Sequence, residues 1–255
     1  MTPPARCQTT FDFRFTEKSP IGTITLASLC RYLLEVADDH AYQLGIDFQN
    51  MFERGLTWAL LRLCIDVPKN LETLTELTLC TWPAARESLY VYRDYEIMST
   101  TGEILGRATS QWVILDLKTH KPVKPPAFLT DLYQNLYQDN IPKRWDISFT
   151  RWNTLNMNEY PLRYECPIIV RRSDTDLNGH TNTASYVEFM EEAIPLELYK
   201  KRSPSYLELN CLTESFEKEH LFSIAEINPE ETEIIHTLIR KHDNTLIARA
   251  KTLWS

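Results

Sequence analysis

The sequence predicts an α+β fold built from two related units, in each of which one long helix is wrapped by an antiparallel sheet. Two observations carry this prediction. First, a short stretch near the amino terminus, Gly22 to Ser28, recurs as Gly179 to Ser185, and each copy opens an amphipathic helix. Second, each helix is followed by strand-like runs separated by turn residues, which is typical of a meander of antiparallel strands.

Length and composition are those of an ordinary globular protein. The chain has 255 residues, of which 43% are hydrophobic and 24% are charged, so it can form one large domain or two small ones. Its formal net charge of −8 argues against a non-specific nucleic-acid binder, because binding to phosphates needs a basic surface. This charge leaves room for a local basic patch that faces an acidic partner.

Nothing in the sequence predicts export, a membrane span or a metal site. The amino terminus lacks the apolar core of a signal peptide, and no apolar run reaches the roughly 18–20 residues of a membrane span. The six cysteines are scattered without a C-x-x-C pair, so we expect reduced thiols in a cytoplasmic protein that binds no metal. The cysteines expected in the core, because they lie in apolar runs, are Cys30, Cys64, Cys80 and Cys211.

The repeat extends beyond the two helix starts. Ile104 to Trp112 matches Leu246 to Trp254, and both stretches contain the pattern Arg-Ala-x-x-x-Trp. Fewer residues separate the two matching stretches here than separate the two helix starts. The second copy therefore lacks a segment that the first copy carries after its helix, and Gly45 to Leu56 is the predicted location of that segment.

The strand-like runs follow each helix in the same order. Turn residues separate them, as at Thr101-Gly102, Asn228-Pro229 and Asp243-Asn244. The predicted strands are Thr73–Thr81, Ser88–Met98 and Ile104–Asp116 in the first copy, and Ser205–Leu212, His220–Ile227, Thr232–Lys241 and Thr245–Leu253 in the second.

A proline-containing connector joins the two copies. It includes one helix-like stretch, Ala127 to Tyr137. The run 143–152 mixes basic and aromatic residues as nucleic-acid surfaces do, but on so acidic a chain we expect it to pack the connector onto the protein. The domain boundaries that follow are 7–122 for an amino-terminal domain, 123–160 for the connector and 161–255 for a carboxy-terminal domain.

The most informative stretch is the loop Asp176-Leu-Asn178-Gly-His180-Thr-Asn182, in which an acid, an amide and an imidazole recur at alternate positions. A β-branched run precedes it, and a helix pattern follows it with Asn182 as the predicted N-cap. The unpaired N–H groups of a helix start favour developing negative charge. Two interpretations follow: an active site, or a polar turn whose Asp, Asn and Gly only make the connection.

Longer motifs favour the active site. In the second copy the signature Ser173-Asp-Thr-Asp-Leu-Asn-Gly-His-Thr-Asn182 is continued by Tyr186 and by Glu191 or Glu192. The matching segments of the first copy are Leu56–Leu63, Thr81–Pro83, Tyr92–Asp94 and Ala108–Trp112 with Asp116. Together these segments resemble the acyl-ACP thioesterases over nearly the whole chain. The resemblance implies two tandem hot-dog domains and a thioester hydrolase that releases fatty acids from acyl carrier protein.

The resemblance also implies a set of catalytic residues. The family's aspartate, asparagine and histidine fall on Asp176, Asn178 and His180, and its glutamate, on the next strand, aligns best with Glu214. Plant members often have cysteine after that glutamate, where this chain has Ser215, which argues against a thiol nucleophile.

Two further positions bear on this comparison. Thr183 stands where plant members tend to have a second asparagine. Cys211 precedes Glu214 by an odd number of residues, so on a strand it would point to the opposite face, into the core.

These residue types suit thioester hydrolysis. A histidine titrates near neutrality, so His180 can take or deliver a proton, and Glu214 can act as a base for water or as a nucleophile that forms a transient anhydride. Asn178 would hydrogen-bond the water or the carbonyl, and Asp176 would orient the loop or bias the His180 tautomer. N–H groups at the helix start would stabilise the oxyanion. The sequence does not divide the roles of the two carboxylates. As structural alternatives, Asp176 would cap the turn and Glu214 would be a solvent-facing strand residue.

The first copy lacks this chemistry. Thr23 stands at the position of His180, and Ile24 and Thr25 replace the polar pair that follows. We therefore expect the first domain to supply the acyl-chain pocket and scaffold, as the resemblance also implies.

The substrate partner that the resemblance implies is acyl carrier protein, which is acidic and itself carries phosphopantetheine, so no enzyme-bound cofactor is expected. A basic patch on this acidic chain would complement it. The candidate contacts are Arg171, Arg172, Lys143 and Arg144, with Arg151 and the run Lys200–Arg202 as further candidates. A solvated face is the alternative for each. No nucleic-acid or membrane partner is expected, and the tandem pair fits either a pseudo-dimeric monomer or a homodimer.

Three functions remain open from the sequence. The favoured one is hydrolysis of acyl-ACP. The second is a hot-dog enzyme that hydrolyses acyl-CoA or hydrates enoyl thioesters, and the third is a non-catalytic acyl-binding module. A binding module would not need the two carboxylates, the amide and the imidazole together. Acyl chain length and saturation are not written in any motif.

Overall fold

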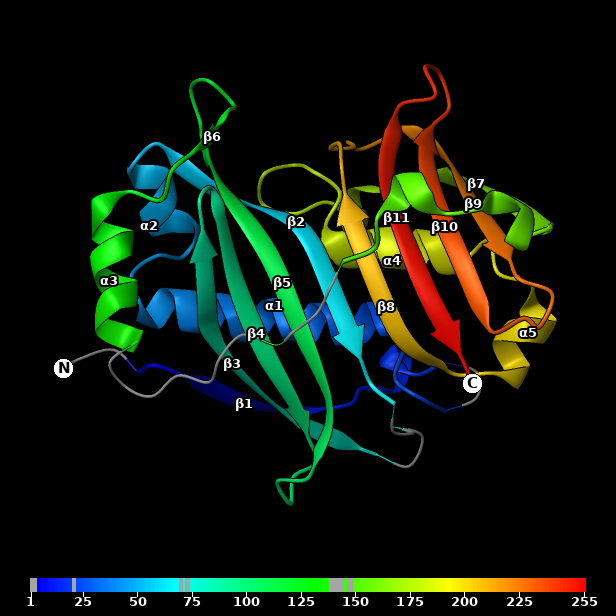
Figure 1. Ribbon diagram of the computed structural model, residues 1–255, viewed down its shortest axis with the longest axis horizontal. Helices are drawn as coiled ribbons and strands as arrows, with labels where there is room; N and C mark the ends of the chain where they lie inside the picture. Colours follow the sequence, from blue (N-terminus) through cyan, green and yellow to red (C-terminus); the bar gives the residue numbers. More distant parts are fainter. Residues whose placement is uncertain (1–3, 20–21, 69–70, 72–73, 138–144, 146–148) are drawn as a thin grey trace. The chain divides into compact units, whose positions relative to one another are not determined.

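The chain folds into two compact units of α+β structure, as predicted. The computed structural model describes residues 4–19, 22–68, 71, 74–137, 145 and 149–255 (Figure 1). Unit 1 comprises Met1–Phe13, Tyr32–Leu63 and Thr75–Ile147; unit 2 comprises Arg14–Arg31, Cys64–Leu74 and Ser148–Ser255. In each unit, helices accompany an antiparallel sheet. The domain boundaries inferred from the sequence remain a prediction.

The sheet of unit 1 contains all three strands predicted for the first copy. Its strands lie in the order β1-β3-β4-β5-β2, with β6 paired to β5. Their bounds are β1 (Cys7–Asp12), β2 (Leu56–Asp66), β3 (Glu76–Glu87), β4 (Tyr90–Met98), β5 (Ile104–Asp116) and β6 (Pro122–Val123). The predicted strand from Ser88 begins two residues later because Ser88 adopts a positive φ of 55° in the β3–β4 turn. Strands β1, β2 and β6 were not predicted.

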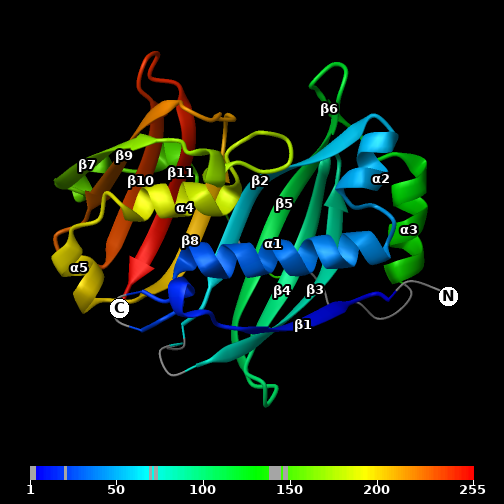
Figure 2. The same cartoon turned by 180° about the vertical axis from the view of Figure 1, so that it is seen from behind.

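The long helix α1 (Leu26–Gln43) forms where the first amphipathic pattern predicted it. Its residues from Tyr32 onward belong to unit 1, where the helix runs along one face of the sheet (Figure 2). Leu33 and Val36 are fully buried there, and the ring of Tyr32 stacks on that of Phe11 in β1 at 4.6 Å. This is the helix-on-sheet packing that the sequence predicted for each copy.

The extra segment of the first copy is a short helix, α2 (Phe48–Glu53). Asp47 caps it by accepting hydrogen bonds from the N–H groups of Gln49 and Asn50 at 3.0 and 3.3 Å. Met51 packs into a hydrophobic cluster with residues of β4, β5 and helix α3 (Ala127–Tyr137), which has the predicted bounds. The insertion therefore extends the hydrophobic core of unit 1.

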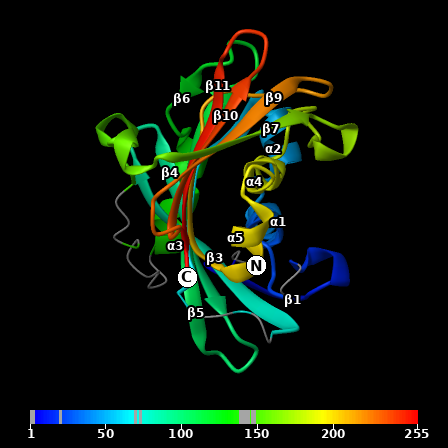
Figure 3. The ribbon, with the colours of Figure 1, turned by 90° about the vertical axis from the view of Figure 1, so that its right-hand side faces the viewer.

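The sheet of unit 2 carries the second copy. Its strands lie in the order β8-β11-β10-β9-β7, and each of β8 to β11 begins and ends within two residues of its predicted bounds. The bounds are β7 (Leu162–Ile169), β8 (Pro204–Cys211), β9 (His220–Ile227), β10 (Glu233–Arg240) and β11 (Leu246–Trp254). Helix α4 (Thr183–Glu191) lies on one side of this curved sheet against β9 and β10, and α5 (Leu196–Lys201) follows it (Figure 3).

Short 3-10 turns complete the described elements. They are η1 (Phe15–Glu17), η2 (Trp152–Thr154), η3 (Met157–Glu159) and η4 (Arg172–Asp174). Within the described ranges, no helix is both long and apolar enough to cross a bilayer.

The connector is held by buried carboxylates in both units. In unit 1, Asp94 accepts a hydrogen bond from the backbone N–H of Trp145 at 2.8 Å, and the guanidinium of Arg107 lies 3.7 Å over the Trp145 ring. In unit 2, Glu208 accepts from the backbone N–H and the hydroxyl of Thr150 at 2.8 and 2.6 Å. Trp145 and Thr150 of the run 143–152 therefore contact the protein, as predicted, whereas Arg151 is exposed; residues 143, 144 and 146–148 lie outside the described residues.

Three of the four cysteines predicted in the core are buried there. Cys30 and Cys64 are fully buried and Cys80 is 5% exposed, whereas Cys211 is half-buried at the end of β8. Burial raises the pKa of the Cys64 and Cys211 thiols to about 12, so both are protonated at neutral pH. All six cysteines are free.

Candidate active site

The loop between η4 and α4 is closed by its own backbone. Asp176 N–H donates to the carbonyl of His180 at 2.8 Å, and Gly179 N–H donates to the carbonyl of Asp176 at 3.0 Å. Gly179 has a φ of +77°, a conformation that favours glycine. The turn therefore projects the side chains of Asn178 and His180 from a fixed backbone.

The carboxylate of Asp176 belongs to the same turn. Its Oδ1 accepts hydrogen bonds from the backbone N–H groups of Asn178 and His180, at 2.8 and 3.2 Å. The hydrogen bonds that the structure gives this carboxylate thus run to the loop backbone, as in an Asx-turn, and none of them joins the His180 ring. The side chain of Asn178 is exposed on the same loop.

Asn182 caps helix α4, as predicted. Its side-chain oxygen accepts from Ser185 N–H at 2.9 Å, and its amide nitrogen donates to the carbonyl of Asp174 at 2.9 Å. The first N–H groups of α4 have no partner inside the helix, so they favour an anion next to the loop. An oxyanion at this helix start would be stabilised by them.

Glu214 reaches the loop from another part of the sequence. Its Oε1 lies 3.4 Å from Nδ1 of His180, whose ring also packs edge-on against Phe216 with centroids 5.2 Å apart. The side chains of His180 and Glu214 are 32% and 55% exposed, so both can meet a substrate from solvent. The structure therefore brings an imidazole and a carboxylate together beside a helix start.

One sequence prediction about Glu214 is wrong. Strand β8 ends at Cys211, and Glu214 lies beyond it in the loop to β9. The strand ends because Leu212 and Thr213 both donate their N–H groups to one carbonyl, that of Ile247, which interrupts the ladder. The argument that strand alternation places Cys211 on the face opposite Glu214 fails with it.

Both parts of the chain match one protein family. The model of the acyl-ACP thioesterase N-terminal domain matches residues 4–133, and that of the acyl-ACP thioesterase C-terminal domain matches residues 162–255. The chain belongs to the acyl-ACP thioesterase family. The loop 176–182 and Glu214 both fall in the part that matches the C-terminal domain.

Curated relatives of this family member come from plants. It is 24% identical over 274 residues to the chloroplastic oleoyl-acyl carrier protein thioesterase 1 of Arabidopsis thaliana, covering 96% of this chain and 74% of the relative. It is also 24% identical over 260 residues to the chloroplastic palmitoyl-acyl carrier protein thioesterase of Gossypium hirsutum, covering 96% of this chain and 62% of that one.

Solved structures of the family have the same fold. An acyl-ACP thioesterase from Bacteroides thetaiotaomicron matches with a TM-score of 0.82 at 21% identity, covering 98% of each chain. The 12:0-ACP thioesterase from Umbellularia californica matches with a TM-score of 0.84 at 22% identity, covering 98% of this chain and 97% of that one. The prediction of two tandem hot-dog domains is confirmed by this likeness.

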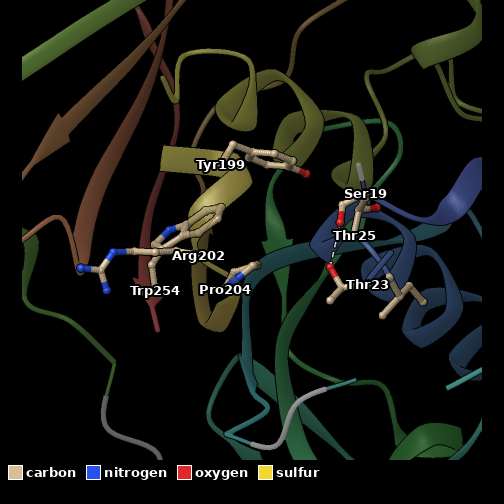
Figure 4. A pocket seen from close by; sticks show the side chains of 8 residues that line it. Ser19, Thr23, Thr25, Tyr199, Arg202, Pro204 and Trp254 are labelled. Atoms are coloured by element: carbon tan, nitrogen blue, oxygen red, sulfur yellow. Dashed lines mark hydrogen bonds between the residues drawn. The ribbon is translucent and has the colours of Figure 1, made fainter. Parts of the chain in front are cut away.

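The first-copy loop of this thioesterase-family chain repeats the backbone of the second without its chemistry. Ser19 N–H donates to the carbonyl of Thr23 at 2.7 Å, and Gly22 N–H donates to the carbonyl of Ser19 at 2.9 Å, the same pattern as in the loop of His180. Ser19 and Thr23 share a hydrogen bond between their hydroxyls (2.8 Å) and line a cavity of only about 10 Å³ with Trp254 (Figure 4). A cavity of this size holds about one water.

The predicted carrier-protein contacts differ in their surroundings. The guanidinium of Arg171 is held by the buried carboxylate of Asp174, with N–O distances of 2.8–3.1 Å. Arg172 is 83% exposed and forms a surface ion pair with Glu217 at 3.1 Å. Lys143 and Arg144 lie outside the described residues.

Sequence reasoning missed the hydroxyls that stand behind the loop. Thr181 and Ser215 are buried and bonded to each other, although each directly follows a predicted site residue. Their positions next to His180 and Glu214 were the available signal. In the part of the chain that the structure describes, no group of three or more His, Cys, Asp or Glu side chains is arranged to hold a metal ion.

Proposed function

We propose that this protein hydrolyses the thioester of fatty acyl-acyl carrier protein, releasing free fatty acid and ending chain elongation. The observation that carries the proposal is the approach of Glu214 Oε1 to His180 Nδ1, 3.4 Å, beside the start of α4 in a member of the acyl-ACP thioesterase family. The names of the plant relatives, which act on oleoyl and palmitoyl carrier-protein thioesters, support the substrate class.

The proposed reaction assigns each group a task. Glu214 and His180 together activate a water molecule, or Glu214 attacks the carbonyl directly and water then cleaves the anhydride. The N–H groups at the start of α4 stabilise the negative charge on the thioester oxygen. Asn178, exposed on the loop, hydrogen-bonds the water or the carbonyl, and His180 returns a proton to the departing thiolate. Asp176 holds the loop through its bonds to the backbone.

The proposed partner is acyl carrier protein, whose phosphopantetheine arm carries the acyl group; the enzyme itself needs no cofactor in this scheme. We place the reaction in the cytoplasm, since the six cysteines are free thiols, as expected in a reducing compartment. The first domain, which lacks a histidine at Thr23, would supply the acyl-chain pocket.

Release of free fatty acid from a panel of acyl-ACPs tests the proposal, with the matching acyl-CoAs as competitors. We expect faster turnover of acyl-ACP, and a fall of about 10²–10⁴ in kcat for both His180→Ala and Glu214→Gln, as for removal of one acid–base group. Comparable or faster turnover of acyl-CoA would point to the second candidate enzyme, and tight acyl binding without turnover would point to a binding module. Full activity of Glu214→Gln would remove Glu214 from the mechanism.

A further inference from the structure

Three buried hydroxyl groups meet directly behind the pair formed by His180 and Glu214. They belong to Thr181, Tyr186 and Ser215, which are 5%, 4% and 0% exposed. Ser215 Oγ lies 2.7 Å from Thr181 Oγ1 and 3.2 Å from the hydroxyl oxygen of Tyr186. We call these three residues the hydroxyl cluster.

The hydroxyl cluster joins two segments that are distant in sequence. Thr181 N–H donates to the carbonyl of Ser215 at 2.8 Å, Thr181 Oγ1 donates to the same carbonyl at 3.1 Å, and Ser215 N–H donates to the Tyr186 hydroxyl at 3.1 Å. Thr181 directly follows His180, and Ser215 directly follows Glu214. Fixing Thr181 against Ser215 therefore fixes the backbone from which the two reactive side chains extend.

The loop that carries Glu214 depends on such contacts. It lies beyond the end of β8, where Thr213 N–H still bonds the carbonyl of Ile247 and an isolated β-bridge pairs Phe216 with His180. On its other side, Arg240 donates a hydrogen bond to the carbonyl of Glu214 at 2.7 Å. Arg240 and the hydroxyl cluster therefore hold the Glu214 backbone from two sides, in addition to these backbone contacts.

The first copy shows that the turn itself does not need these hydroxyls. Since Gly22 matches Gly179, at an offset of 157 residues, Thr181 corresponds to Ile24 and Tyr186 corresponds to Leu29, both buried and apolar. Even so, the Ser19–Thr23 turn keeps the same backbone hydrogen bonds as the Asp176–His180 turn. The hydroxyl groups therefore occur in the copy that has the imidazole and the carboxylate. The other copy forms the same turn without them.

We propose that Tyr186, Thr181 and Ser215 are positioning residues for the thioester chemistry, which set the separation between His180 Nδ1 and Glu214 Oε1. This inference rests on the proposed function. It also gives Ser215 a role: its hydroxyl is fully buried and bonded to two other hydroxyls, so it positions its neighbour and is not a nucleophile. A shift of about 1 Å in such a pair can cost about 10²-fold in rate.

The first test uses substitutions that remove one hydroxyl each. Tyr186→Phe and Thr181→Val should lower kcat about 10- to 100-fold with KM little changed, and Thr181→Ser, which keeps the hydroxyl, should restore most of the rate. Tyr160→Phe is the matched control, because Tyr160 is another buried tyrosine of the same unit, bonded to Glu233. Wild-type kcat in both Tyr186→Phe and Thr181→Val would overturn the proposal.

A double-mutant cycle separates positioning from a general loss of stability. If the hydroxyl cluster acts through Glu214, adding Tyr186→Phe to Glu214→Gln should cause no further loss of kcat, whereas a purely structural effect should lower both backgrounds equally. An equal loss in both backgrounds would overturn the proposal even if the single variant is slow.

Crystal structures of the wild type and Tyr186→Phe give a readout that does not depend on turnover. We expect the separation between Nδ1 and Oε1, 3.4 Å in the wild type, to lengthen in the variant. An unchanged separation would overturn the positioning role. Absence of acyl-ACP hydrolysis by the wild type would overturn the proposed function, and the structural comparison would still decide whether the cluster sets the pair.

Discussion

At the scale of single residues, the carboxyl group of Glu191 has a strongly shifted pKa. This residue lies on the helix that follows the candidate active-site loop. It lies on α4 and lines a groove of about 760 Å³ together with Arg31 and Tyr199. Its Oε1 atom is buried with no hydrogen-bond partner among the described residues, and the Tyr199 hydroxyl bonds the carboxyl group. Burial, and then repulsion from Glu188 and Glu192, raises the pKa of Glu191 to about 8.

This raised pKa predicts how stability depends on pH. In the folded protein Glu191 keeps its proton up to about pH 8, whereas in the unfolded chain the carboxyl group has its ordinary pKa of 4.5. Between pH 4.5 and about pH 8 the folded state therefore binds more protons than the unfolded state. The contribution of Glu191 to the free energy of unfolding consequently falls as the pH rises through this range. The full shift would correspond to roughly 5 kcal/mol, and we expect a smaller effect because part of the side chain remains accessible.

Glu191→Gln tests this prediction. Melting temperatures of the wild type and the variant, measured from pH 5 to pH 9, should diverge as pH rises, with the variant becoming relatively more stable on the alkaline side. Parallel curves would show that Glu191 does not hold a proton in the folded protein. The comparison of the two proteins cancels the titration of all other groups.

At the scale of elements, the loop before α4 contains both of the interpretations that the sequence left open. Asp176 caps the turn through two backbone bonds, as a structural residue would, while His180 on the same turn meets Glu214. The two interpretations are compatible, because a capped turn is what holds an imidazole in place. Alternation and turn residues predicted this loop and the strands around it. They did not predict that β8 ends three residues before Glu214. The end of β8 depends on two N–H groups that share the carbonyl of Ile247, a residue distant in sequence.

Substitution of Asp176 distinguishes capping from an electrostatic role. Asp176→Asn keeps an acceptor oxygen and should retain most of the hydrolase activity, whereas Asp176→Ala should lose about 0.5–2 kcal/mol of stability, as for loss of a cap, together with activity. Thermal unfolding and kcat measured on both variants test this. A large loss of kcat in Asp176→Asn without loss of stability would show that the negative charge itself is required.

At the scale of the whole molecule, the net charge of −8 repels the acidic partner of the proposed function, so docking depends on a local basic patch. Arg171 neutralises buried Asp174, so its charge serves the fold. Arg172, 83% exposed, is the better candidate contact of the two, and its ion pair with Glu217 is a weak surface interaction that a partner can replace.

Charge reversal at this position tests the docking surface. Arg172→Glu should raise KM for acyl-ACP several-fold with kcat and stability unchanged, and the effect should shrink at high salt. Glu217→Gln, which frees the arginine, is the matched control and should leave KM equal or lower. An identical increase of KM for acyl-CoA in Arg172→Glu would assign the effect to the active site instead of carrier-protein docking.

The sequence by itself determined most of the strands and long helices of this protein, its internal repeat and the cap of α4, because periodicity, turn residues and the Asn182 side chain act over a few residues. The sequence did not predict β1, because this strand forms by pairing with the distant strand β3, where Cys7 and Phe11 are buried. Tertiary structure alone decided that Glu214 meets His180 and that Ser215 meets Thr181. These contacts join segments 34 residues apart, and their geometry depends on where β8 ends and how the following loop packs behind α4.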